Sequence, residues 1–422
     1  MHRALLILIV IFLALPIRAK SDTFTKDYQS LVDDINQHAF LAPRLDFASI
    51  ITQLKDQKPI LSKQITQWQH RLKALTPNSV CQSIAYDSLV QHLQLLEERE
   101  FLKTSLTKTS HYNGDFKDLN DAKRWYQHWL NSWLSDNVSP TQLKQIANEE
   151  LTLAFAAYQA VKSNTEKEKL GTIPAENHTE IVNAFYTRQR LVEATLKNVL
   201  GLTDDIAQVN IAPSGLPESF PAPGIYNSQT QTFLYHAHNG VMNKAHLDWL
   251  YLHEALPGHH LQHMRITESP TCPSNQFMPD PFVSAEGWAA YIETLGEQFG
   301  LYQHPSSKAY ALEWQVLRAL RVLIDIGIHF ENWTDKEAES LWLTYLPHRP
   351  GIMKREIKRI KNWPVQVITY VYGKHKIEQA LVNYKTAYKD KKQKRVLNHI
   401  LHLSNLPPLA LNYLPQIIKQ KM

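Results

Sequence analysis

Apolar residues recur at spacings of three and four along most of this chain, and this pattern constrains the fold more than any other feature of the sequence. Such spacing gathers apolar side chains on one face of an α-helix, where they can pack against other helices. Ser139 and Gln142 add the signature of a capping box, which marks a helix start. We therefore predict a mainly α-helical protein. The clearest helical segments are residues 28–42, 61–75, 84–106, 122–134, 141–161 and 181–200.

One region departs from the helical pattern. Residues 209–212 and 232–236 are short β-branched or aromatic runs, and the Pro- and Gly-rich residues 213–224 separate them. These features predict a small β-sheet close to the densest cluster of ionisable residues. A peptide substrate could add a strand to the edge of this sheet, or the sheet could be a hairpin with a purely structural role. Residues 111–117 and 164–174 are predicted to be loops.

The N-terminus has the pattern of a secretory signal peptide. Arg3 precedes an apolar run over residues 4–15, and Ala19 is a small residue at the expected cleavage site. The run is shorter than the roughly 20 residues of a membrane-spanning helix, although an N-terminal anchor is an alternative. No cysteine follows it closely, which argues against a lipid-modified N-terminus. We predict an exported protein, periplasmic or secreted, with no membrane span after signal removal.

The predicted organisation is a signal peptide over residues 1–19, an N-terminal helical region over 20–115 and a catalytic domain over 116–422. This length allows two lobes or one large domain. Without the two arginines of the signal peptide, 43 basic residues face 40 acidic ones, a net charge of +3. Such a small excess argues against a nucleic-acid partner. The basic tract 389–395 is interpreted as a solvated helix face.

The sequence contains two cysteines, Cys81 and Cys272. In an oxidising compartment they could form a disulfide bond, and they could equally remain free thiols. Two cysteines cannot make a thiolate zinc site, so a metal in this chain would have to be bound by histidine and carboxylate.

The densest ionisable cluster lies in residues 253–263, where four histidines and one glutamate occur. Zinc peptidases commonly place two histidines four residues apart on one helical face, with a glutamate after the first. Here Pro257 stands four residues after His253, and the next histidine is His259. On a straight helix His259 would lie about 120° around and 9 Å along the axis from His253. Two zinc bonds of about 2.1 Å cannot bridge that separation.

A break in the helix would remove this obstacle. Pro257 lacks an amide proton and its ring clashes with the carbonyl four residues back, while Gly258 can adopt conformations closed to other residues. We predict a break at residues 256–258 that turns His259 towards the metal bound by His253. The alternatives for the second histidine ligand are His260 and a competing pair formed by His259 and His263.

A third ligand is predicted in the helical pattern of residues 284–293. Glu286 is the expected ligand, and Glu293, seven residues later on the same face, is expected to orient a ligand histidine. An acid on a largely apolar helix is costly unless it is paired or metal-bound. The alternative is that both acids are solvated. Small residues at Gly287 and Ala289 would let this helix approach another closely.

Two motifs carry a resemblance to a known family. Residues 253–262 have the pattern HExxPGHHxQ, and residues 286–293 have the pattern EGWAxYxE. Together they resemble the paired signature of the domain-of-unknown-function 885 (DUF885) family, a group of zinc-metallopeptidase-like proteins. Similar segments follow downstream, at residues 318–322, 325–329, 333, 359, 364–366, 370–373, 399 and 406–409.

The resemblance implies a mainly α-helical fold related to thermolysin-type and carboxypeptidase Taq-like metallopeptidases. It also implies one Zn²⁺ per chain, bound by two histidines and one glutamate, and hydrolysis of peptide substrates. The chain departs from the family at residues 364–367, which are Pro-Val-Gln-Val where relatives tend to have Pro-Gly-Gln-Ala. The part before about residue 115 also matches poorly. These departures concern the substrate pocket more than the metal ligands.

The expected mechanism assigns further residues. Glu254 is the expected general base, which takes a proton from water and later passes it to the leaving amine. His329 and Tyr370 are candidate donors to the oxyanion. Arg321 and Arg359 are candidates for holding a substrate carboxylate if the enzyme trims C-termini.

Two other functions remain open. A non-catalytic zinc- or partner-binding protein could keep the same fold, and the altered residues 364–367 motivate that alternative. Glu254 argues against it, because metal binding alone needs no carboxylate beside the first ligand. A carbohydrate-active enzyme could use Glu254 with Glu286 or Glu293 as a carboxylate pair, but that chemistry does not require a histidine cluster.

Overall fold

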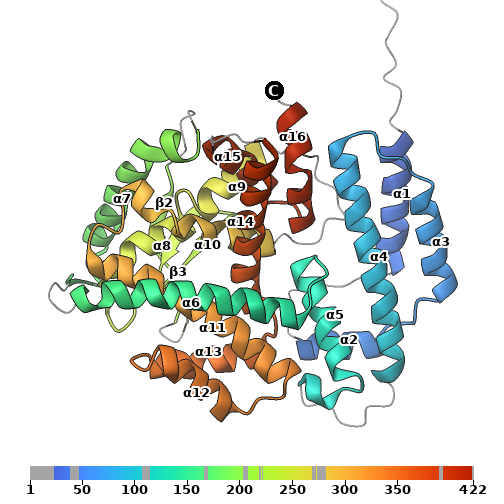
Figure 1. Ribbon diagram of the computed structural model, residues 1–422, viewed down its shortest axis with the longest axis horizontal. Helices are drawn as coiled ribbons and strands as arrows, with labels where there is room; N and C mark the ends of the chain where they lie inside the picture. Colours follow the sequence, from blue (N-terminus) through green and yellow to red (C-terminus); the bar gives the residue numbers. More distant parts are fainter. Residues whose placement is uncertain are drawn as a thin grey trace, which may run out of the picture.

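The computed structural model describes residues 23–38, 47–106, 115–165, 170–202, 208–217, 220, 222–268, 272, 282–388 and 393–420. The predicted signal peptide, most of the predicted loop at 111–117 and most of the basic tract at 389–395 lie outside these residues. Within them the chain is mainly α-helical, as predicted (Figure 1). No helix of this described part is both long and apolar enough to cross a membrane.

The six predicted helical segments correspond to α1 and α3–α7. The α-helices are α1 Thr23–His38, α2 Phe47–Asp56, α3 Ser62–Lys73, α4 Val80–Leu106, α5 Ala122–Leu134, α6 Pro140–Thr165, α7 His178–Val199, α8 Leu247–Glu254, α9 His259–Glu268, α10 Phe282–Glu293, α11 Pro305–Phe330, α12 Asp335–Tyr345, α13 Pro350–Asn362, α14 Thr369–Tyr388, α15 Gln393–Leu403 and α16 Leu414–Gln420. Short 3₁₀-helices are η1 Phe116–Asp118, η2 Lys244–His246, η3 Gly296–Phe299, η4 Gln366–Ile368 and η5 Pro408–Tyr413.

The start of α6 confirms the predicted capping box. The backbone amide of Gln142 donates to Oγ of Ser139 (3.2 Å), and the amide of Ser139 donates to Oε1 of Gln142 (2.9 Å). The loop predicted at 164–174 is wrong at both ends, because α6 continues to Thr165 and a strand occupies Thr172–Pro174. That strand is too short to show an alternating apolar pattern.

The strands form two small sheets. They are β1 Thr172–Pro174, β2 Asn210–Pro213, β3 Gly224–Asn227, β4 Thr232–Tyr235 and β5 Val241–Asn243. One sheet has the order β2-β4-β3, with β2 parallel and β3 antiparallel to β4, and the other pairs β1 with β5 antiparallel. The predicted sheet is therefore present. The two predicted runs are not a simple hairpin, because they pair in parallel and β3, which begins at the last residue of the predicted connecting segment, lies on the other side of β4.

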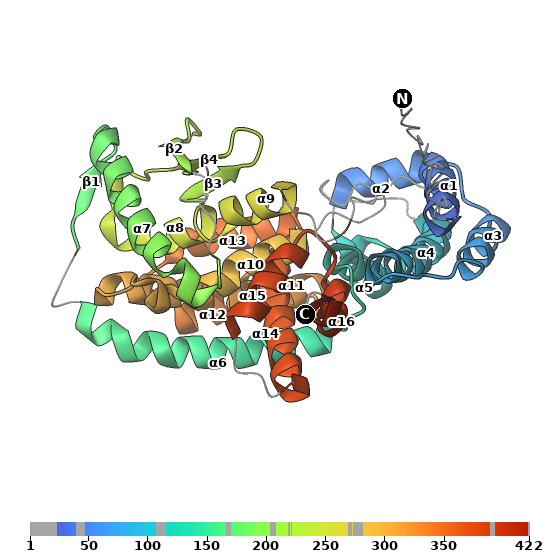
Figure 2. The ribbon, with the colours of Figure 1, turned by 90° about the horizontal axis from the view of Figure 1, so that it is seen from above.

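Three hydrophobic clusters hold the described helices together. One joins the sheets to α7–α10 and the C-terminal helices, a second joins α5, α6, α11 and α13, and a third lies among α1, α3 and α4. The second cluster also contains Phe47 of α2, whose ring lies 5.2 Å from that of Trp129 on α5. The N-terminal helices form one end of the molecule (Figure 2), but the predicted boundary at residue 115 is not a break in packing.

Helices α10 and α14 cross in close contact because glycine meets glycine. A Cβ on Gly287 would lie 2.4 Å from Cα of Gly373, and a Cβ on Gly373 would lie 2.1 Å from the carbonyl oxygen of Val283. Side chains at either position would push the helices apart. The predicted role of Gly287 in close helix approach is confirmed, and the crossing brings the start of α14 next to Glu286.

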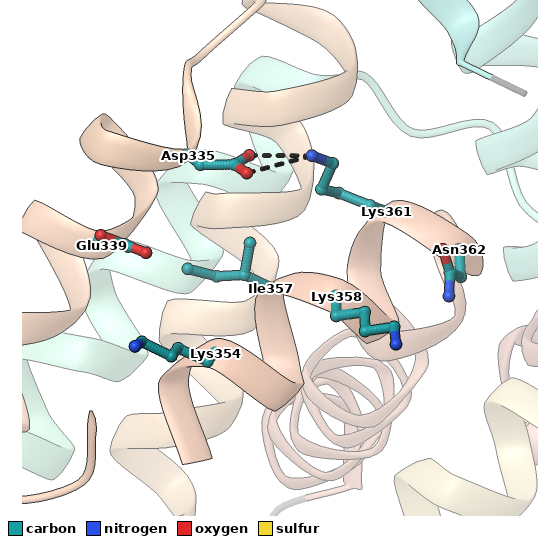
Figure 3. Close-up of a pocket in the computed structure, with 7 residues that line it drawn as sticks. All are labelled: Asp335, Glu339, Lys354, Ile357, Lys358, Lys361 and Asn362. Carbon is teal, nitrogen blue, oxygen red and sulfur yellow. Dashed lines mark hydrogen bonds and ion pairs between the residues drawn. The ribbon is translucent and has the colours of Figure 1, made fainter. Parts of the chain in front are cut away.

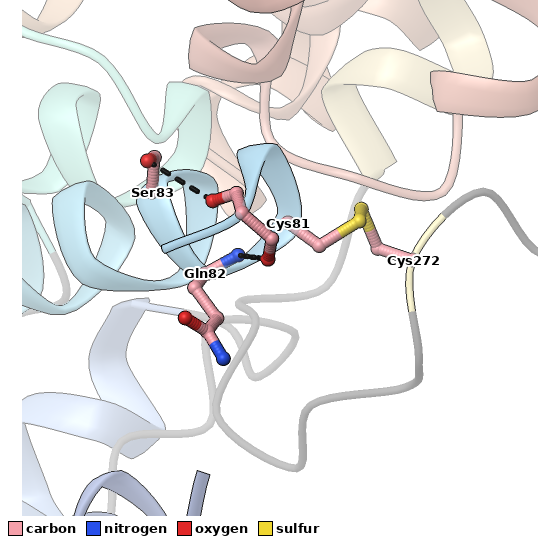
Figure 4. The surroundings of a disulfide bond; sticks show 5 residues. Cys81, Gln82, Ser83 and Cys272 are labelled. Carbon is pink, nitrogen blue, oxygen red and sulfur yellow. Dashed lines mark hydrogen bonds between the residues drawn. A yellow bond between two sulfur atoms is a disulfide. The ribbon is translucent and has the colours of Figure 1, made fainter. Parts of the chain in front are cut away.

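Cys81 and Cys272 form a disulfide bond (Figure 4). Cys81 lies in the first turn of α4, and Cys272 lies between α9 and α10 in the sequence. Of the two possibilities left open above, the structure has the paired one. The bond joins the N-terminal helices to the connection between two helices that carry candidate metal ligands.

Replacing both cysteines by serine is expected to lower the free energy of unfolding by up to about 5 kcal/mol. The bond closes a loop of 191 residues, and in the chain-entropy model such a cross-link restricts the unfolded chain strongly. Chemical denaturation of the oxidised wild type and of the double serine variant would measure the difference. Equal midpoints, together with two titratable thiols in the native protein, would contradict the expectation.

Candidate metal centre

The predicted helix break separates two candidate ligands. Helix α8 ends at Glu254 and α9 begins at His259, and the peptide bond before the intervening proline is cis. Gly258 passes so close to the end of α8 that a Cβ there would lie 2.0 Å from the carbonyl oxygen of His253. No other residue type fits that path. The indole of Trp288 donates to the carbonyl of the proline at 2.8 Å and holds the break against α10.

The break brings His259 beside His253, and both face Glu286 of α10. Oε2 of Glu286 lies 3.5 Å from Nε2 of His253 and 3.6 Å from Nε2 of His259. One ligand atom from each residue lies within 4.8 Å of the other two. The side chains of His253, His259 and Glu286, which we call the triad, are 7%, 17% and 12% exposed. Three consecutive helices thus place three ligands around one point.

The alternative histidines point elsewhere. Nδ1 of His260 lies 3.0 Å from the hydroxyl of Tyr226 on β3. The ring of His263 also lies beside Tyr226, with ring centroids 6.0 Å apart. The structure therefore favours His259 as the second histidine ligand over His260 and over the competing pair.

The triad fits a zinc ion. Ligand atoms at about 2.1 Å in a tetrahedral arrangement lie about 3.4 Å apart, close to the two distances from Glu286. Oε2 of Glu286 is buried, and its contacts with the two histidine nitrogens, at 3.5 and 3.6 Å, are too long for strong hydrogen bonds, so a cation bound among the three side chains would satisfy this ionised oxygen better. The triad is the one group of three such ligands found in the described part of the chain.

The charges of the triad are strongly coupled. Burial lowers the pKa of His253, but hydrogen bonds with Glu286 and Glu293 outweigh it and raise that pKa to about 9. Burial raises the pKa of Glu286, yet hydrogen bonds with His253 and His259 hold it well below its usual range. Glu286 therefore stays ionised, and a metal ion must compete with a proton for His253.

A buried ion pair contacts the Nδ1 side of the His253 ring. Nδ1 of His253 lies 2.6 Å from Oε1 of Glu293, which is fully buried. The guanidinium of Arg318 donates to both oxygens of Glu293, at 2.5 and 2.8 Å. An Nδ1–H donated to Glu293 leaves the Nε2 lone pair facing the metal position. The predicted orienting position of Glu293 agrees with this geometry.

Arg318 was not assigned a role from the sequence. It stands in α11 among buried apolar residues, and its side chain is 5% exposed. A charge at such a position needs a partner, so the apolar surroundings were the available signal. They do not reveal that the partner is Glu293, 25 residues away in the sequence.

Two other predicted residues lie beside the triad. Glu254 is buried next to His253, and its charge contributes to the raised pKa of that histidine. The ring of Tyr370, in the first turn of α14, is stacked 6.3 Å from the ring of His253. Burial and the charge of Glu286 raise the pKa of Tyr370, so its hydroxyl keeps its proton and can donate it in a hydrogen bond.

The family follows from comparison with known proteins. A sequence model for the family described as bacterial protein of unknown function (DUF885) matches residues 17–407. The chain belongs to the DUF885 family. The predicted membership of the family is confirmed, and the match includes most of the region before residue 115, where the sequence analysis expected a poor match.

Two solved structures share the fold of this DUF885 protein. One is described as a "putative lipoprotein" from Colwellia psychrerythraea, with a TM-score of 0.63, 19% identity, and coverage of 94% of this chain and 73% of that one. The other is described as a "putative lipoprotein of unknown function" from Shewanella oneidensis, with a TM-score of 0.54, 18% identity, and coverage of 93% and 73%. No curated protein matches the chain.

Two predicted residues of this DUF885 protein lie in other surroundings. His329 is buried, its Nε2 lies 3.0 Å from the carbonyl oxygen of Ile360, and its ring packs against Tyr126. It follows Arg318 by three turns of α11, about 16 Å along the axis, so its contacts do not support the oxyanion assignment. Arg321 forms a buried ion pair with Glu356 at 2.8 Å and is not free to bind a substrate carboxylate.

A pocket between α12 and α13 is distinct from the triad (Figure 3). Its volume is about 340 Å³, and an ion pair between Asp335 and Lys361 crosses it. No triad residue lines it, so it is not the candidate site. The lining residues are Asp335, Glu339, Lys354, Ile357, Lys358, Lys361 and Asn362.

Proposed function

We propose that this DUF885 protein is an exported zinc-dependent peptidase. The observation that carries the proposal is the buried triad of His253, His259 and Glu286, with Glu254 next to its first member. Two imidazoles and one carboxylate are a donor set that suits zinc and leaves a position for water or substrate. One zinc ion per chain is expected.

The roles of the residues follow from their positions. Zinc at such a site lowers the pKa of water and polarises a peptide carbonyl. Glu254 takes one proton from the water whose oxygen bonds to the carbonyl carbon, and it delivers that proton to the amine nitrogen as the carbon–nitrogen bond breaks. Tyr370 donates a hydrogen bond from its hydroxyl group to the developing oxyanion. Glu293 and Arg318 keep His253 in the required tautomer.

Glu254 favours catalysis over binding alone. It is 7% exposed, and it makes no hydrogen bond or ion pair with the other described residues. A buried carboxylate of this kind is costly to keep, and metal binding does not need it. A glycosidase pair is disfavoured as well, because Glu293 is held by Arg318 and His253 and cannot serve as an acid for a substrate.

Within the altered residues 364–367, Val365 adopts a backbone conformation that favours glycine. Val365 has a φ of 72°, the left-handed conformation that favours glycine, which is the residue expected there from the family resemblance. Its amide donates to Oδ2 of Asp325 at 2.7 Å. The substitution changes a side chain but keeps the backbone conformation that favours glycine. The altered segment therefore gives little support to the non-catalytic alternative.

Export rests on three observations. The N-terminal sequence has a signal-peptide pattern, and the two solved structures named above are each described as a "putative lipoprotein". The Cys81–Cys272 bond suits an oxidising compartment. We therefore place the protein outside the cytoplasm, in the periplasm or beyond it.

Metal analysis of matched variants tests the proposal. We expect about one zinc per chain in the wild type and in His260→Ala, because His260 is not a member of the group of three candidate ligands and its Nδ1 lies beside Tyr226. We expect zinc to be lost from His253→Ala and Glu286→Ala. Glu254→Gln should keep zinc and lose peptide hydrolysis by a factor on the order of 10² to 10⁴, the usual contribution of a general base.

The same experiment separates the alternatives. Full zinc occupancy in both ligand variants would place the metal elsewhere and contradict the assignment. Hydrolysis that survives chelation or the Glu254→Gln change would overturn the mechanism. Zinc binding without hydrolysis of any peptide in a mixed library would favour the non-catalytic protein.

A further inference from the structure

We propose that Arg359 binds the C-terminal carboxylate of the substrate, which would make this protein a carboxypeptidase that removes single residues. This inference rests on the proposed peptidase function and names its substrate class. It follows from the arrangement of three arginines around Tyr370.

Two of these arginines are already neutralised. Arg318 lies 4.9 Å from the ring of Tyr370, and its charge is paired with Glu293. Arg321 lies 5.9 Å from the same ring, and its charge is paired with Glu356. Both are buried, and each guanidinium already pairs with a buried carboxylate.

Arg359 differs from both. Its guanidinium donates to the amide oxygen of Gln366 at 2.7 Å, and no carboxylate of the described residues pairs with it at ion-pair distance. The side chain is only partly buried, unlike those of Arg318 and Arg321. A partly buried cation with no carboxylate at ion-pair distance is well suited to bind an anionic ligand, and a guanidinium binds a carboxylate through two parallel hydrogen bonds.

Tyr370 links Arg359 to the metal centre. Burial lowers the pKa of Arg359, but the neighbouring Tyr370, Glu356 and Glu286 outweigh it and raise that pKa, so Arg359 stays charged close to Tyr370 and the triad. The ring of Tyr370 is stacked on that of His253 at 6.3 Å. A cation therefore lies one side chain away from the triad.

A terminal carboxylate is the anion that must lie near the metal centre in a carboxypeptidase. One residue of extended chain spans at most about 3.6 Å, so the carboxylate of the last residue follows its scissile carbonyl closely. A main-chain carboxylate is present in every peptide at this position, whatever the last side chain is. An acidic side chain or a phosphate group carries a similar negative charge, but its distance from the scissile carbonyl varies from one peptide to another. Peptide amides that carry such groups distinguish them from a terminal carboxylate.

Paired peptides with a free C-terminus and with a C-terminal amide test the inference on the wild type. Hydrolysis of the free acids should release one amino acid at a time, with kcat/KM lower for the amides by a factor on the order of 100, as expected when a charged hydrogen bond is lost. Arg359→Met should lower kcat/KM for the acids to the level of the amides, and Arg359→Lys should restore part of it. Lys358→Met is the matched control, because Lys358 lies on the same helix but lines the pocket of Figure 3.

Binding provides a second readout that does not need hydrolysis. Titration of the metal-free wild type, followed by tryptophan fluorescence, should show tighter binding of the free acid than of the amide, and Arg359→Met should abolish the difference. Equal hydrolysis of acids and amides, or cleavage at internal bonds, would overturn the inference while the peptidase function stands. Equal binding of a peptide amide with an acidic or phosphorylated side chain would also overturn it. Absence of zinc would refute the proposed function separately.

Discussion

Gly258→Ala is expected to destabilise the protein by about 3 kcal/mol or more and to remove zinc binding. The added Cβ would lie 2.0 Å from the carbonyl oxygen of His253 and 2.3 Å from that of Leu252. Both contacts are with backbone oxygens, so the clash cannot be relieved by rotating a side chain. Relief requires that α9 moves from the end of α8, and this movement separates His259 from His253.

The chain contains a control for this substitution. Gly351 also follows a proline, lies in the first turn of α13 and has nothing within 4 Å of a Cβ placed on it. Gly351→Ala should therefore be neutral or slightly stabilising, since alanine favours helix. Zinc content and denaturation midpoints of the two variants would measure the effects. A Gly258→Ala protein with wild-type zinc content would contradict the described path of the helix break.

Arg318→Met is expected to weaken zinc binding by about 10- to 100-fold. The substitution removes the two hydrogen bonds that fix Glu293, so the carboxylate behind His253 loses its orientation. It also leaves the fully buried Glu293 without its arginine, and breaking a buried ion pair typically costs about 3–5 kcal/mol. Competition with a chelator of known affinity would measure zinc binding, and chemical denaturation would measure stability.

Arg321→Met separates the two effects. Arg321 lies on the same helix in a buried ion pair of similar geometry, but its partner is Glu356 and not a neighbour of His253. Its loss should lower stability to a similar extent and leave zinc affinity within about threefold of the wild type. If both variants lost zinc affinity equally, the effect would reflect general destabilisation, and the positioning role of Arg318 would be refuted.

The sequence was most informative where the chemistry is local. The predicted break depends on Pro257 and Gly258 themselves, so it could be located before the structure was known. The capping box at Ser139 and the helical periodicity of α3–α7 are local in the same sense. Glu286 was predicted to be a candidate ligand because an acid is unexpected among the apolar and small residues that surround it.

Contacts between distant segments were predicted less well. Arg318 and Arg321 are both arginines on α11, and no local property distinguishes the one that supports His253 from the one that pairs with Glu356. His329 occurs in a family-like segment, yet it packs on Tyr126 far from the triad. Strand β3 was missed because its pairing with β4, rather than its own composition, makes it a strand.

By itself, the sequence determined the helical class of this DUF885 protein, the position of the helix break and the candidate ligands, because backbone sterics and helical periodicity act over a few residues. Helix packing placed His259, rather than His260, in one group with His253 and Glu286, paired Cys81 with Cys272, and left Arg359 without the carboxylate partners that Arg318 and Arg321 have. These outcomes depend on which helices meet. The packing of α8, α9, α10, α11 and α14 determines the distances between side chains that are far apart in the sequence.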